Sequence, residues 1–336
     1  MSMAVAVFGA GSWGTALALL IARNGHAVTL WGRDPAHIEA LARDRCNQRY
    51  LPGFPFPDNL SVTADLAAAA QSCALALVAV PSHAFRELLP QLRGHLSAPQ
   101  KIAWATKGLE SRSGRLLHEV VAEGLGAATP AAVLSGPTFA GEVAAGQPTA
   151  ITVASANPAF AQEVAGLLHS LNFRAYTTDD MIGVQLGGAT KNVLAIAAGM
   201  AEGLGFGANA RAALVTRGLA EMMRLGMAMG GRPETLMGLA GVGDLILTCT
   251  DNQSRNRRFG LGLGRGQPRE EVAAAIGQEI EGVATAGIIH RLAQSHGIDM
   301  PITEQVCLIL HAGLAPAEAV RNLLLREPKP ESALPC

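Results

Sequence analysis

The chain has 336 residues with a formal net charge of −1 at pH 7, and 49% of its residues are hydrophobic while only 4% are aromatic. A near-zero charge without a basic run does not indicate nucleic acid or an anionic membrane as a partner. The apolar N-terminal stretch lacks the basic start of a signal peptide, and no apolar run in the sequence is long enough for a membrane span. The cysteines and histidines lack metal-type spacing, so we expect reduced thiols, a cytoplasmic protein and no metal site.

Short apolar segments in the first half of the chain predict β-strands. They lie at 3–9, 27–32, 74–80, 101–106, 131–136, 149–155 and 173–178. Helical segments separate most of them, which is typical of a buried, mostly parallel sheet with helices on both faces.

The strand pattern stops near residue 179. Segments rich in Ala, Leu, Met and Gly with helical spacing follow over 180–230 and 268–325. We therefore predict an α/β domain over 1–179 and an all-helical domain over 180–326, in line with a chain length that favours two domains. The polar, proline-rich end at 327–336 predicts a flexible tail. The Ala-, Gly- and Met-rich helices leave room for a homodimer interface.

The glycine motif Gly9-x-Gly11-x-x-Gly14 follows the first predicted strand and begins a helix. Gly9 permits a tight turn, Gly11 lets the backbone approach a pyrophosphate, and Gly14 lets the helix pack on the strand. The helix N-terminus attracts the phosphate charge. Because the motif has the strand and helix that it requires, it predicts a dinucleotide site rather than a plain strand–helix turn.

The choice of dinucleotide depends on the end of the second strand, "LWGRDP". An NAD-selective site usually carries an acid there, which holds the ribose 2′-hydroxyl. This chain has Arg33, a cation suited to a 2′-phosphate, and we expect Asp34 to cap the helix that Pro35 begins. We therefore predict NADP(H), with NAD(H) tolerated. The alternative for Arg33 is a solvated surface charge.

The segments "VAVPSHAF", "WATKGLE" and "SGPTFAGEVAAG" each follow a predicted strand of the same sheet. Ligands of an open α/β sheet bind beyond the carboxyl ends of its strands, so Ser82, Phe85 and Lys107 are expected on the ligand side. Pro137 is expected in the first turn of a helix whose free N–H groups face the ligand.

Several segments occur in an order that is specific to one family. They are "GAGSWGTALA", "VPSHAF", "ATKGLE", "SGPTFAGEVAAGQPTA", "KNVLAIAAGMAEGLGFGANARAALVTRGLAEM", "GDLILTCTDNQSRNRRFG" and "MPITEQV". Together they resemble the bacterial NAD(P)-dependent glycerol-3-phosphate dehydrogenases, as far as about residue 325. The resemblance implies a Rossmann-type domain followed by an all-helical domain. It also implies reversible hydride transfer between NAD(P)H and dihydroxyacetone phosphate, giving sn-glycerol 3-phosphate for glycerophospholipid synthesis in the cytoplasm.

The resemblance also implies residue roles. The family's catalytic lysine falls on Lys191. Its substrate contacts fall on Lys107, Gly136, Thr138, Lys191 and Asp244, and its phosphate contacts on Ser254, Arg255 and Asn256. Its cofactor contacts, which add to the glycines of the motif, fall on Ser12, Trp13, Arg33, Lys107, Ala140, Arg255, Glu279 and Glu281.

The chemistry of ketone reduction suits these residue types. Lys191 lies in the apolar stretch "VQLGGATKNVLAIAAGMAEG", where desolvation lowers a lysine pKa, so it can act as general acid in reduction and general base in oxidation. Lys107 would hold the developing oxyanion, and Asp244 would orient an ammonium group or bind a substrate hydroxyl. The alternatives are a snorkelling helix lysine for Lys191 and a helix cap for Asp244.

The segment "DNQSRNRRFG" predicts the phosphate site, because arginine makes bidentate phosphate contacts. With Arg255 directed inward, we expect Arg257 and Arg258 to be surface cations. We expect His83 to be structural or to support a residue that contacts the ligand, and Cys249 to have no role in the chemistry.

Two other functions share part of this sequence pattern. Dehydrogenases of 3-hydroxy acids such as 6-phosphogluconate or hydroxyisobutyrate also use a lysine on the first helix of a helical domain, but the phosphate segment argues against them. A regulator that senses the NADP redox state without turnover would need neither Lys191 nor the phosphate segment.

Overall fold

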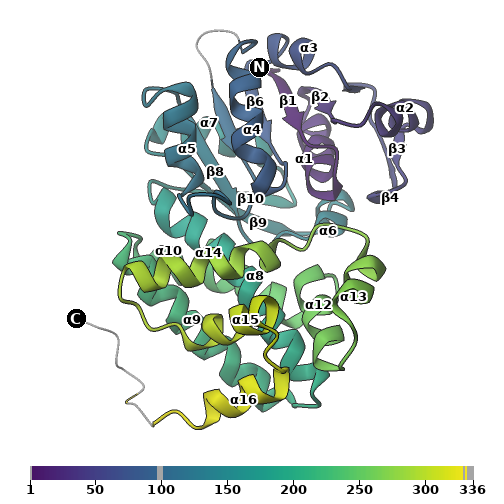
Figure 1. Cartoon of the computed structure of the whole chain (residues 1–336). Helices are drawn as coiled ribbons and strands as arrows, with labels where there is room; N and C mark the ends of the chain where they lie inside the picture. Colours follow the sequence, from purple (N-terminus) through teal and green to yellow (C-terminus); the bar gives the residue numbers. More distant parts are fainter. Residues whose placement is uncertain (1, 97–100, 328–329, 331–336) are drawn as a thin grey trace. The chain divides into compact units, whose positions relative to one another are not determined.

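The computed structural model describes residues 2–96, 101–327 and 330, and its internal contacts group the chain into two compact units (Figure 1). Unit 1 comprises Met1–Thr106 and Arg115–Met181, and unit 2 comprises Lys107–Gly114 and Ile182–Cys336. Of the tail predicted at 327–336, only residues 327 and 330 are among those described. Within the described ranges, no helix is long and apolar enough to cross a membrane.

Unit 1 is built on an eight-stranded sheet with the order β10-β9-β8-β7-β6-β1-β2-β5. The pair β8–β9 is antiparallel and the other neighbouring pairs are parallel, which confirms the prediction of a mostly parallel sheet. The strands are β1 (Ala4–Phe8), β2 (Ala27–Trp31), β5 (Leu60–Thr63), β6 (Leu75–Val78), β7 (Ile102–Trp104), β8 (Ala131–Ser135), β9 (Thr149–Ala154) and β10 (Phe173–Thr178).

Three short strands were not predicted. They are β5 and the antiparallel pair β3 (Cys46–Asn47) and β4 (Leu51–Pro55). The sequence of β4, LPGFP, contains two prolines and a glycine, residues that are depleted in strands, so its composition hides the pairing.

Two groups of helices cover the sheet of unit 1 (Figure 1). α1 packs against α6 and α7, and α4 packs against α3 and α5. The core between helices and sheet is mainly Ala, Val, Leu and Ile, as the low aromatic content requires. The helices are α1 (Ser12–Arg23), α2 (Pro35–Asp44), α3 (Leu66–Gln71), α4 (Ser82–Arg93), α5 (Leu117–Leu125), α6 (Ala140–Ala144) and α7 (Pro158–Leu168).

The prediction for Pro137 is wrong. α6 begins at Ala140, with Phe139 as its N-cap, and Pro137 lies in the bend that precedes it. The hydroxyl of Thr138 donates to the carbonyl oxygen of Gly136 at 3.2 Å. This local bond stabilises a turn, so the helix starts later than the proline alone would suggest.

Within its described residues, the regular secondary structure of unit 2 is helical, and the segment Lys107–Gly114 forms turns and bends. Residues 184–201 of α8 are all buried, so the few polar side chains among them, such as Lys191 and Asn192, need partners inside the unit. The elements are α8 (Met181–Gly203), α9 (Ala208–Ala228), α10 (Pro233–Leu236), the π-helical turn η1 (Leu239–Gly243), α11 (Asp244–Thr250), α12 (Arg255–Gly264), α13 (Arg269–Ile276), α14 (Glu281–Ser295), α15 (Pro301–Ala312) and α16 (Pro316–Leu324).

α8 and α12 approach each other backbone to backbone along a glycine seam. The seam consists of Gly199 and Gly203 on α8 and of Gly260 and Gly264 on α12. A Cβ at any of the four would lie between 2.0 and 2.4 Å from a carbonyl oxygen of the facing helix. Only glycine permits this approach, so the seam fixes the distance between the two helices.

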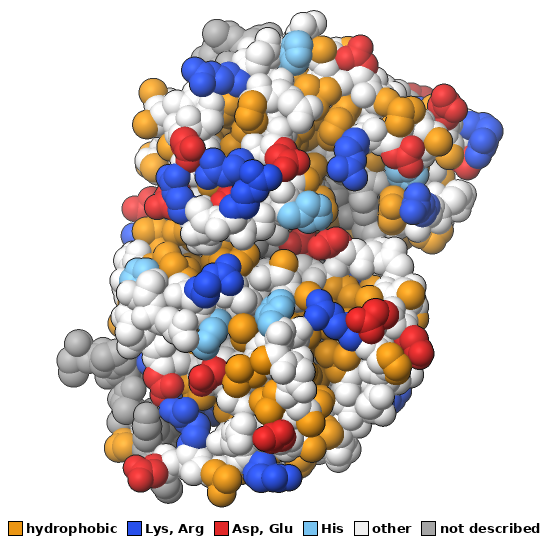
Figure 2. Space-filling model, in the orientation of Figure 1, with side chains coloured by type: hydrophobic (Ala, Val, Ile, Leu, Met, Phe, Trp, Pro, Cys, Tyr) orange, Lys and Arg blue, Asp and Glu red, His pale blue; other side chains and the backbone are white. Residues whose placement is uncertain are grey.

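Acidic and basic side chains are interspersed on the face shown in Figure 2, and the largest group of basic side chains there has acidic neighbours. This distribution agrees with the near-zero net charge of the sequence.

The buried carboxylate of Glu221 on α9 holds the start of α15. It accepts from the backbone N–H groups of Ile302 (2.6 Å) and Thr303 (3.1 Å) and from the Thr303 hydroxyl (2.9 Å). We expect Glu221→Ala to lower the free energy of unfolding by about 2–4 kcal/mol, because these buried donors lose their acceptor.

Urea denaturation of parent and variant measures this loss. The matched control is Glu318→Ala, because Glu318 is an exposed acid in the first turn of α16 and its removal should change the free energy by less than about 0.5 kcal/mol. Equal losses in the two variants would contradict the capping role of Glu221.

Candidate active site

The glycine motif forms the turn between β1 and α1 in unit 1. Gly9 has φ of 129°, and a Cβ there would lie 2.7 Å from the carbonyl oxygen of Ala79. A Cβ at Gly14 would lie 1.9 Å from the carbonyl oxygen of Gly9 and 3.3 Å from the Ala79 Cβ. Both positions therefore require glycine, one for the turn and one for close packing of helix on sheet.

Gly11 differs from the other two glycines. It is the N-cap of α1, and among the described residues nothing lies within 4 Å of a Cβ built on it. The first turn of α1 thus has open space beside it and backbone N–H groups without a side-chain cap. This geometry suits a pyrophosphate at the helix N-terminus.

Ser12 and Trp13 follow in the first turn of α1. The Ser12 hydroxyl donates to the carbonyl oxygen of Tyr50 at 2.7 Å. The indole Nε1 of Trp13 is buried and has no hydrogen-bond partner among the residues that the structure describes. Buried donors are normally paired, so a bound group that accepts from this N–H would complete the site. These features fit a dinucleotide.

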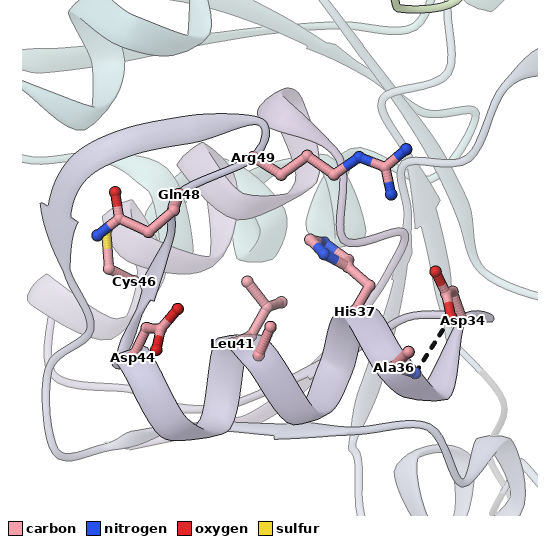
Figure 3. A pocket seen from close by; sticks show the side chains of 9 residues that line it. Asp34, Ala36, His37, Leu41, Asp44, Cys46, Gln48 and Arg49 are labelled. Carbon is pink, nitrogen blue, oxygen red and sulfur yellow. Dashed lines mark hydrogen bonds between the residues drawn. The ribbon is translucent and has the colours of Figure 1, made fainter.

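The turn between β2 and α2 carries Arg33 and Asp34. Asp34 accepts from the backbone N–H of Ala36 at 3.1 Å, which confirms it as the cap of α2, while Arg33 is exposed. A pocket of about 320 Å³ lies between α2 and the chain at 46–49 (Figure 3). Its lining carries both signs of charge and consists of Asp34, Ala36, His37, Ala40, Leu41, Asp44, Cys46, Gln48 and Arg49.

The other predicted residues of unit 1 lie at the ends of strands or the starts of helices. Gly136 and Thr138 are buried in the bend after β8, and Ala140 is the half-buried first residue of α6. Phe85 is fully buried and packs edge-on against Trp104, with ring centroids 6.0 Å apart. It is therefore a core residue and does not face a ligand.

Two lysines share one carboxylate in unit 2. Lys191 on α8 donates from Nζ to Asp244 Oδ1 at 2.5 Å and to the Thr248 hydroxyl at 2.9 Å. Lys107 donates from Nζ to Asp244 Oδ2 at 2.7 Å. Asp244 is only 1% exposed and Lys191 only 6%. The Asp244 carboxylate, at the start of α11, therefore accepts from two ammonium groups and does not cap the helix. Of the two alternatives for Asp244, this is the one in which it orients an ammonium group.

Burial controls the protonation of this cluster. It lowers the pKa of Lys191 to about 7; the negative charge of Asp244 opposes the shift and the positive charge of Lys107 adds to it. Ammonium and neutral amine are then both populated near neutral pH, as a general acid that also serves as general base requires.

The π-helical turn η1 brings Asp244 to Lys191. A Cβ at Gly187, one turn before Lys191, would lie 2.5 Å from the carbonyl oxygen of Ala240 in η1. Thr248, four residues after Asp244, lies on the same face of α11 and donates to the Asp244 carbonyl oxygen at 2.6 Å. The four-residue spacing in "GDLILT" is the pattern from which Thr248 could have been predicted.

The predicted phosphate segment begins α12. Ser254 is its N-cap and accepts from the backbone N–H of Arg257 at 3.2 Å. The amide of Asn256 donates to Asn192 Oδ1 at 3.0 Å and accepts from the backbone N–H of Gly282 at 2.9 Å. Asn192 follows Lys191 on α8, so this chain of hydrogen bonds ties the predicted phosphate segment to the helix that carries Lys191.

Arg255 lies beside the start of α14. Its guanidinium donates to Gln278 Oε1 at 3.4 Å. Burial lowers the Arg255 pKa, and the negative charges of Glu281 and Glu279 oppose that shift. Glu279 is exposed and Glu281 half-buried. Two of the predicted cofactor contacts thus act electrostatically on a third.

The prediction that Arg257 is a surface cation is wrong. Its side chain is 4% exposed and donates to the side chains of Glu202 on α8 and Asn252. Arg258 is exposed, as predicted. Cys249 is fully buried, and burial raises the pKa of its thiol to about 12, which makes it unreactive near neutral pH.

Comparison with known proteins decides the family. The model for the N-terminus of NAD-dependent glycerol-3-phosphate dehydrogenase matches residues 4–161, and the model for its C-terminus matches 180–321. The chain is 63% identical over 332 residues to glycerol-3-phosphate dehydrogenase (NAD(P)+) of Methylococcus capsulatus, covering 98% of this chain and 99% of that protein. This chain belongs to the NAD-dependent glycerol-3-phosphate dehydrogenase family.

Further relatives agree with this membership. Glycerol-3-phosphate dehydrogenase (NAD(P)+) of Pseudoalteromonas translucida is 58% identical, covering 98% of each chain. The crystal structure of glycerol-3-phosphate dehydrogenase from Coxiella burnetii superposes with a TM-score of 0.94 at 52% identity, covering 97% of this chain and 99% of that one. The Rossmann-type sheet of unit 1 and the helical unit 2 are therefore those of a dehydrogenase family that depends on NAD(P).

Each unit gathers part of the predicted site of this family. Unit 1 holds Gly9, Gly11, Ser12, Trp13, Gly14, Arg33, Gly136, Thr138 and Ala140. Unit 2 holds Lys107, Lys191, Asp244, Ser254, Arg255, Asn256, Glu279 and Glu281. Within unit 2, direct hydrogen bonds join Lys107, Asp244 and Lys191, and a second group links Asn192, Asn256 and Gly282.

Proposed function

We propose that this chain reduces dihydroxyacetone phosphate reversibly to sn-glycerol 3-phosphate, with NADPH preferred and NADH tolerated. The bound nicotinamide supplies the hydride. The observation that carries the proposal is the buried pair of Lys191 and Asp244, in a chain that belongs to the glycerol-3-phosphate dehydrogenase family. An ammonium with a pKa near 7, held by a carboxylate, is the group that ketone reduction needs.

Lys191 is the proposed general acid. Its ammonium gives a proton to the carbonyl oxygen during reduction, and the neutral amine takes it back from the alcohol during oxidation. Asp244 holds the Lys191 ammonium in place through Oδ1 and that of Lys107 through Oδ2. Lys107, partly open to solvent, stabilises the negative charge that develops on the substrate oxygen.

Gly136 and Thr138 are the proposed substrate contacts of unit 1. Ser254, Arg255 and Asn256 are proposed to bind the substrate phosphate. The guanidinium of Arg255 offers a bidentate contact, and the second N–H of the Asn256 amide and the Ser254 hydroxyl can complete the cage. The first turn of α12 adds backbone N–H groups, which favour an anion.

The proposed cofactor contacts lie in both units. Gly9, Gly11 and Gly14 bring the backbone and the N-terminus of α1 to the pyrophosphate, with Ser12 and Trp13 in the same turn. Arg33, exposed after β2, supports the preference for a 2′-phosphate. The remaining proposed contacts are Lys107, Ala140, Arg255, Glu279 and Glu281.

The proposed setting is the cytoplasm, where the product would serve glycerophospholipid synthesis. The described cysteines support it, because Cys46, Cys73, Cys249 and Cys307 are free thiols, as expected of a reducing compartment.

Turnover of the parent chain tests the proposal. We expect oxidation of NADPH with dihydroxyacetone phosphate at a kcat/KM of about 10⁴ M⁻¹s⁻¹ or more, slower turnover with NADH, and none in a matched assay with 6-phosphogluconate or hydroxyisobutyrate and NADP⁺. Turnover of a hydroxy acid would favour the alternative dehydrogenase. Binding of NADPH without turnover of any ketone phosphate would favour the redox sensor.

A further inference from the structure

Arg257 is a buried cation inside the helical unit that has no assigned role. Its guanidinium donates to Glu202 near the end of α8 and to Asn252 in the turn before α12. Its backbone N–H donates to the hydroxyl of Ser254. One residue therefore joins α8, the turn at 252–254 and the first turn of α12.

Arg257 cannot itself bind substrate phosphate. The guanidinium is 4% exposed, its two terminal nitrogens are engaged with Asn252 and Glu202, and its Nε is buried without a partner among the described residues. Its counter-charge, Glu202, lies eleven residues after Lys191 on α8, which is about 16 Å along the helix axis. Arg257 must therefore act through the residues that it holds.

Those residues belong to the segment that is proposed to bind phosphate. Asn252 and Gln253 are exposed, and Gln253 donates from its backbone N–H to Asp251 Oδ1 at 2.7 Å within the same turn. α12 itself is held separately, by the glycine seam and by the bond between Asn256 and Asn192. Loss of the guanidinium would thus release Asn252 and loosen the turn that leads to Ser254, while the helix stays packed and the backbone bond to Ser254 is still available.

We propose that Arg257, paired with Glu202, is a positioning residue that holds Asn252, and with it the turn at 252–254 that leads into the phosphate segment, in the geometry that binds the substrate phosphate. The inference rests on the proposed function. Phosphate binding contributes to ground state and transition state alike, so loosening this turn should raise KM with little change in kcat.

Steady-state kinetics of Arg257→Met test this role. We expect KM for dihydroxyacetone phosphate to rise about 10–100-fold, as for loss of a charge-assisted hydrogen bond, with kcat within about threefold of the parent. Arg257→Lys should recover part of the loss, because an ammonium can pair with Glu202 but cannot span Asn252 as well. The dissociation constant of NADPH should stay within about twofold.

Arg258→Met is the matched control. Arg258 is the exposed neighbour on the same turn of α12, and its removal should change KM by less than about twofold. Asn252→Ala removes the partner instead of the arginine and should raise KM in the same direction; because Asn252 is exposed, this variant tests the proposal even where Arg257→Met fails to fold.

Two results would overturn the inference. One is a lower melting temperature together with a lower kcat and an unchanged KM, because a purely structural ion pair would reduce the fraction of folded enzyme without changing substrate binding. The other is an unchanged KM in both Arg257→Met and Asn252→Ala. Failure of the proposed function is distinct from either result, because the parent itself would then not turn over dihydroxyacetone phosphate.

Discussion

Lys191→Met should reduce kcat for dihydroxyacetone phosphate by about 10³-fold or more while NADPH binding is retained. Methionine keeps the unbranched, mainly apolar shape of the side chain but removes the ammonium that donates the proton. Asp244 keeps Lys107 as a partner, so the carboxylate is not left unpaired. Kinetics of NADPH oxidation, with NADPH binding measured separately, give the two quantities.

The matched control for this variant is Lys101→Met. Lys101 is half-buried and pairs with Glu163 at 2.7 Å within unit 1, so the variant also removes an ammonium from a lysine–carboxylate pair. Its kcat should stay within about twofold of the parent. If Lys191→Met were as active as Lys101→Met, Lys191 would be a structural helix lysine and the proposed acid would be wrong.

The fold of both units could largely be predicted from the sequence because the decisive patterns are local. The apolar segments at 3–9 and 27–32 contain β1 and β2, and the glycine motif between them marks the turn into α1. The short strands β3, β4 and β5 could not be predicted in this way. β3 has only two residues, β4 carries two prolines and a glycine, and the four-residue β5 is defined by its pairing with β2, about 30 residues earlier in the chain.

The choice between neighbouring arginines shows where local pattern fails. Arg255 and Arg257 lie in one motif, and nothing in their spacing shows that Arg257 is buried. Arg257 is buried because Glu202 on α8, 55 residues earlier in the chain, supplies its counter-charge. The buried bonds of Glu221 to α15 likewise join residues about 80 positions apart.

Lys107 illustrates the same limit at the level of units. It follows strand β7 of unit 1, yet the segment Lys107–Gly114 groups with unit 2 and places its ammonium on Asp244. Strand order predicts that Lys107 lies beyond a carboxyl end of the sheet. The sequence does not show that Lys107 pairs with the carboxylate of Asp244, 137 residues later, because this contact forms only in the folded chain.

The pH dependence of the parent follows from Lys191. Since its pKa is lowered to about 7, the rate of ketone reduction should fall as the pH rises through about 7, because the ammonium donor is lost. Alcohol oxidation should show the opposite trend, because it needs the neutral amine. Initial rates of reduction and of oxidation, measured at pH values on both sides of 7, test these two opposite trends.

Asp244→Asn should lower kcat for reduction at neutral pH by about 10²-fold. The Asp244 carboxylate raises the pKa of Lys191 against the effect of burial, so removing its charge lowers that pKa further. Less ammonium then remains at neutral pH, and the fall in the reduction rate moves to lower pH. The control is Asp299→Asn, an exposed acid paired with Arg326, which should leave both rate and profile unchanged.

The ratio of the two directions separates a shifted pKa from a damaged fold. Partial unfolding removes active molecules and lowers reduction and oxidation by the same factor at every pH. A lower Lys191 pKa instead depresses reduction more than oxidation near neutrality, and acidification restores part of the reduction rate. If the pH–rate profile of Asp244→Asn kept the midpoint of the parent, Asp244 would orient Lys191 without setting its pKa. A loss of orientation alone would lower the rates of reduction and oxidation by similar factors.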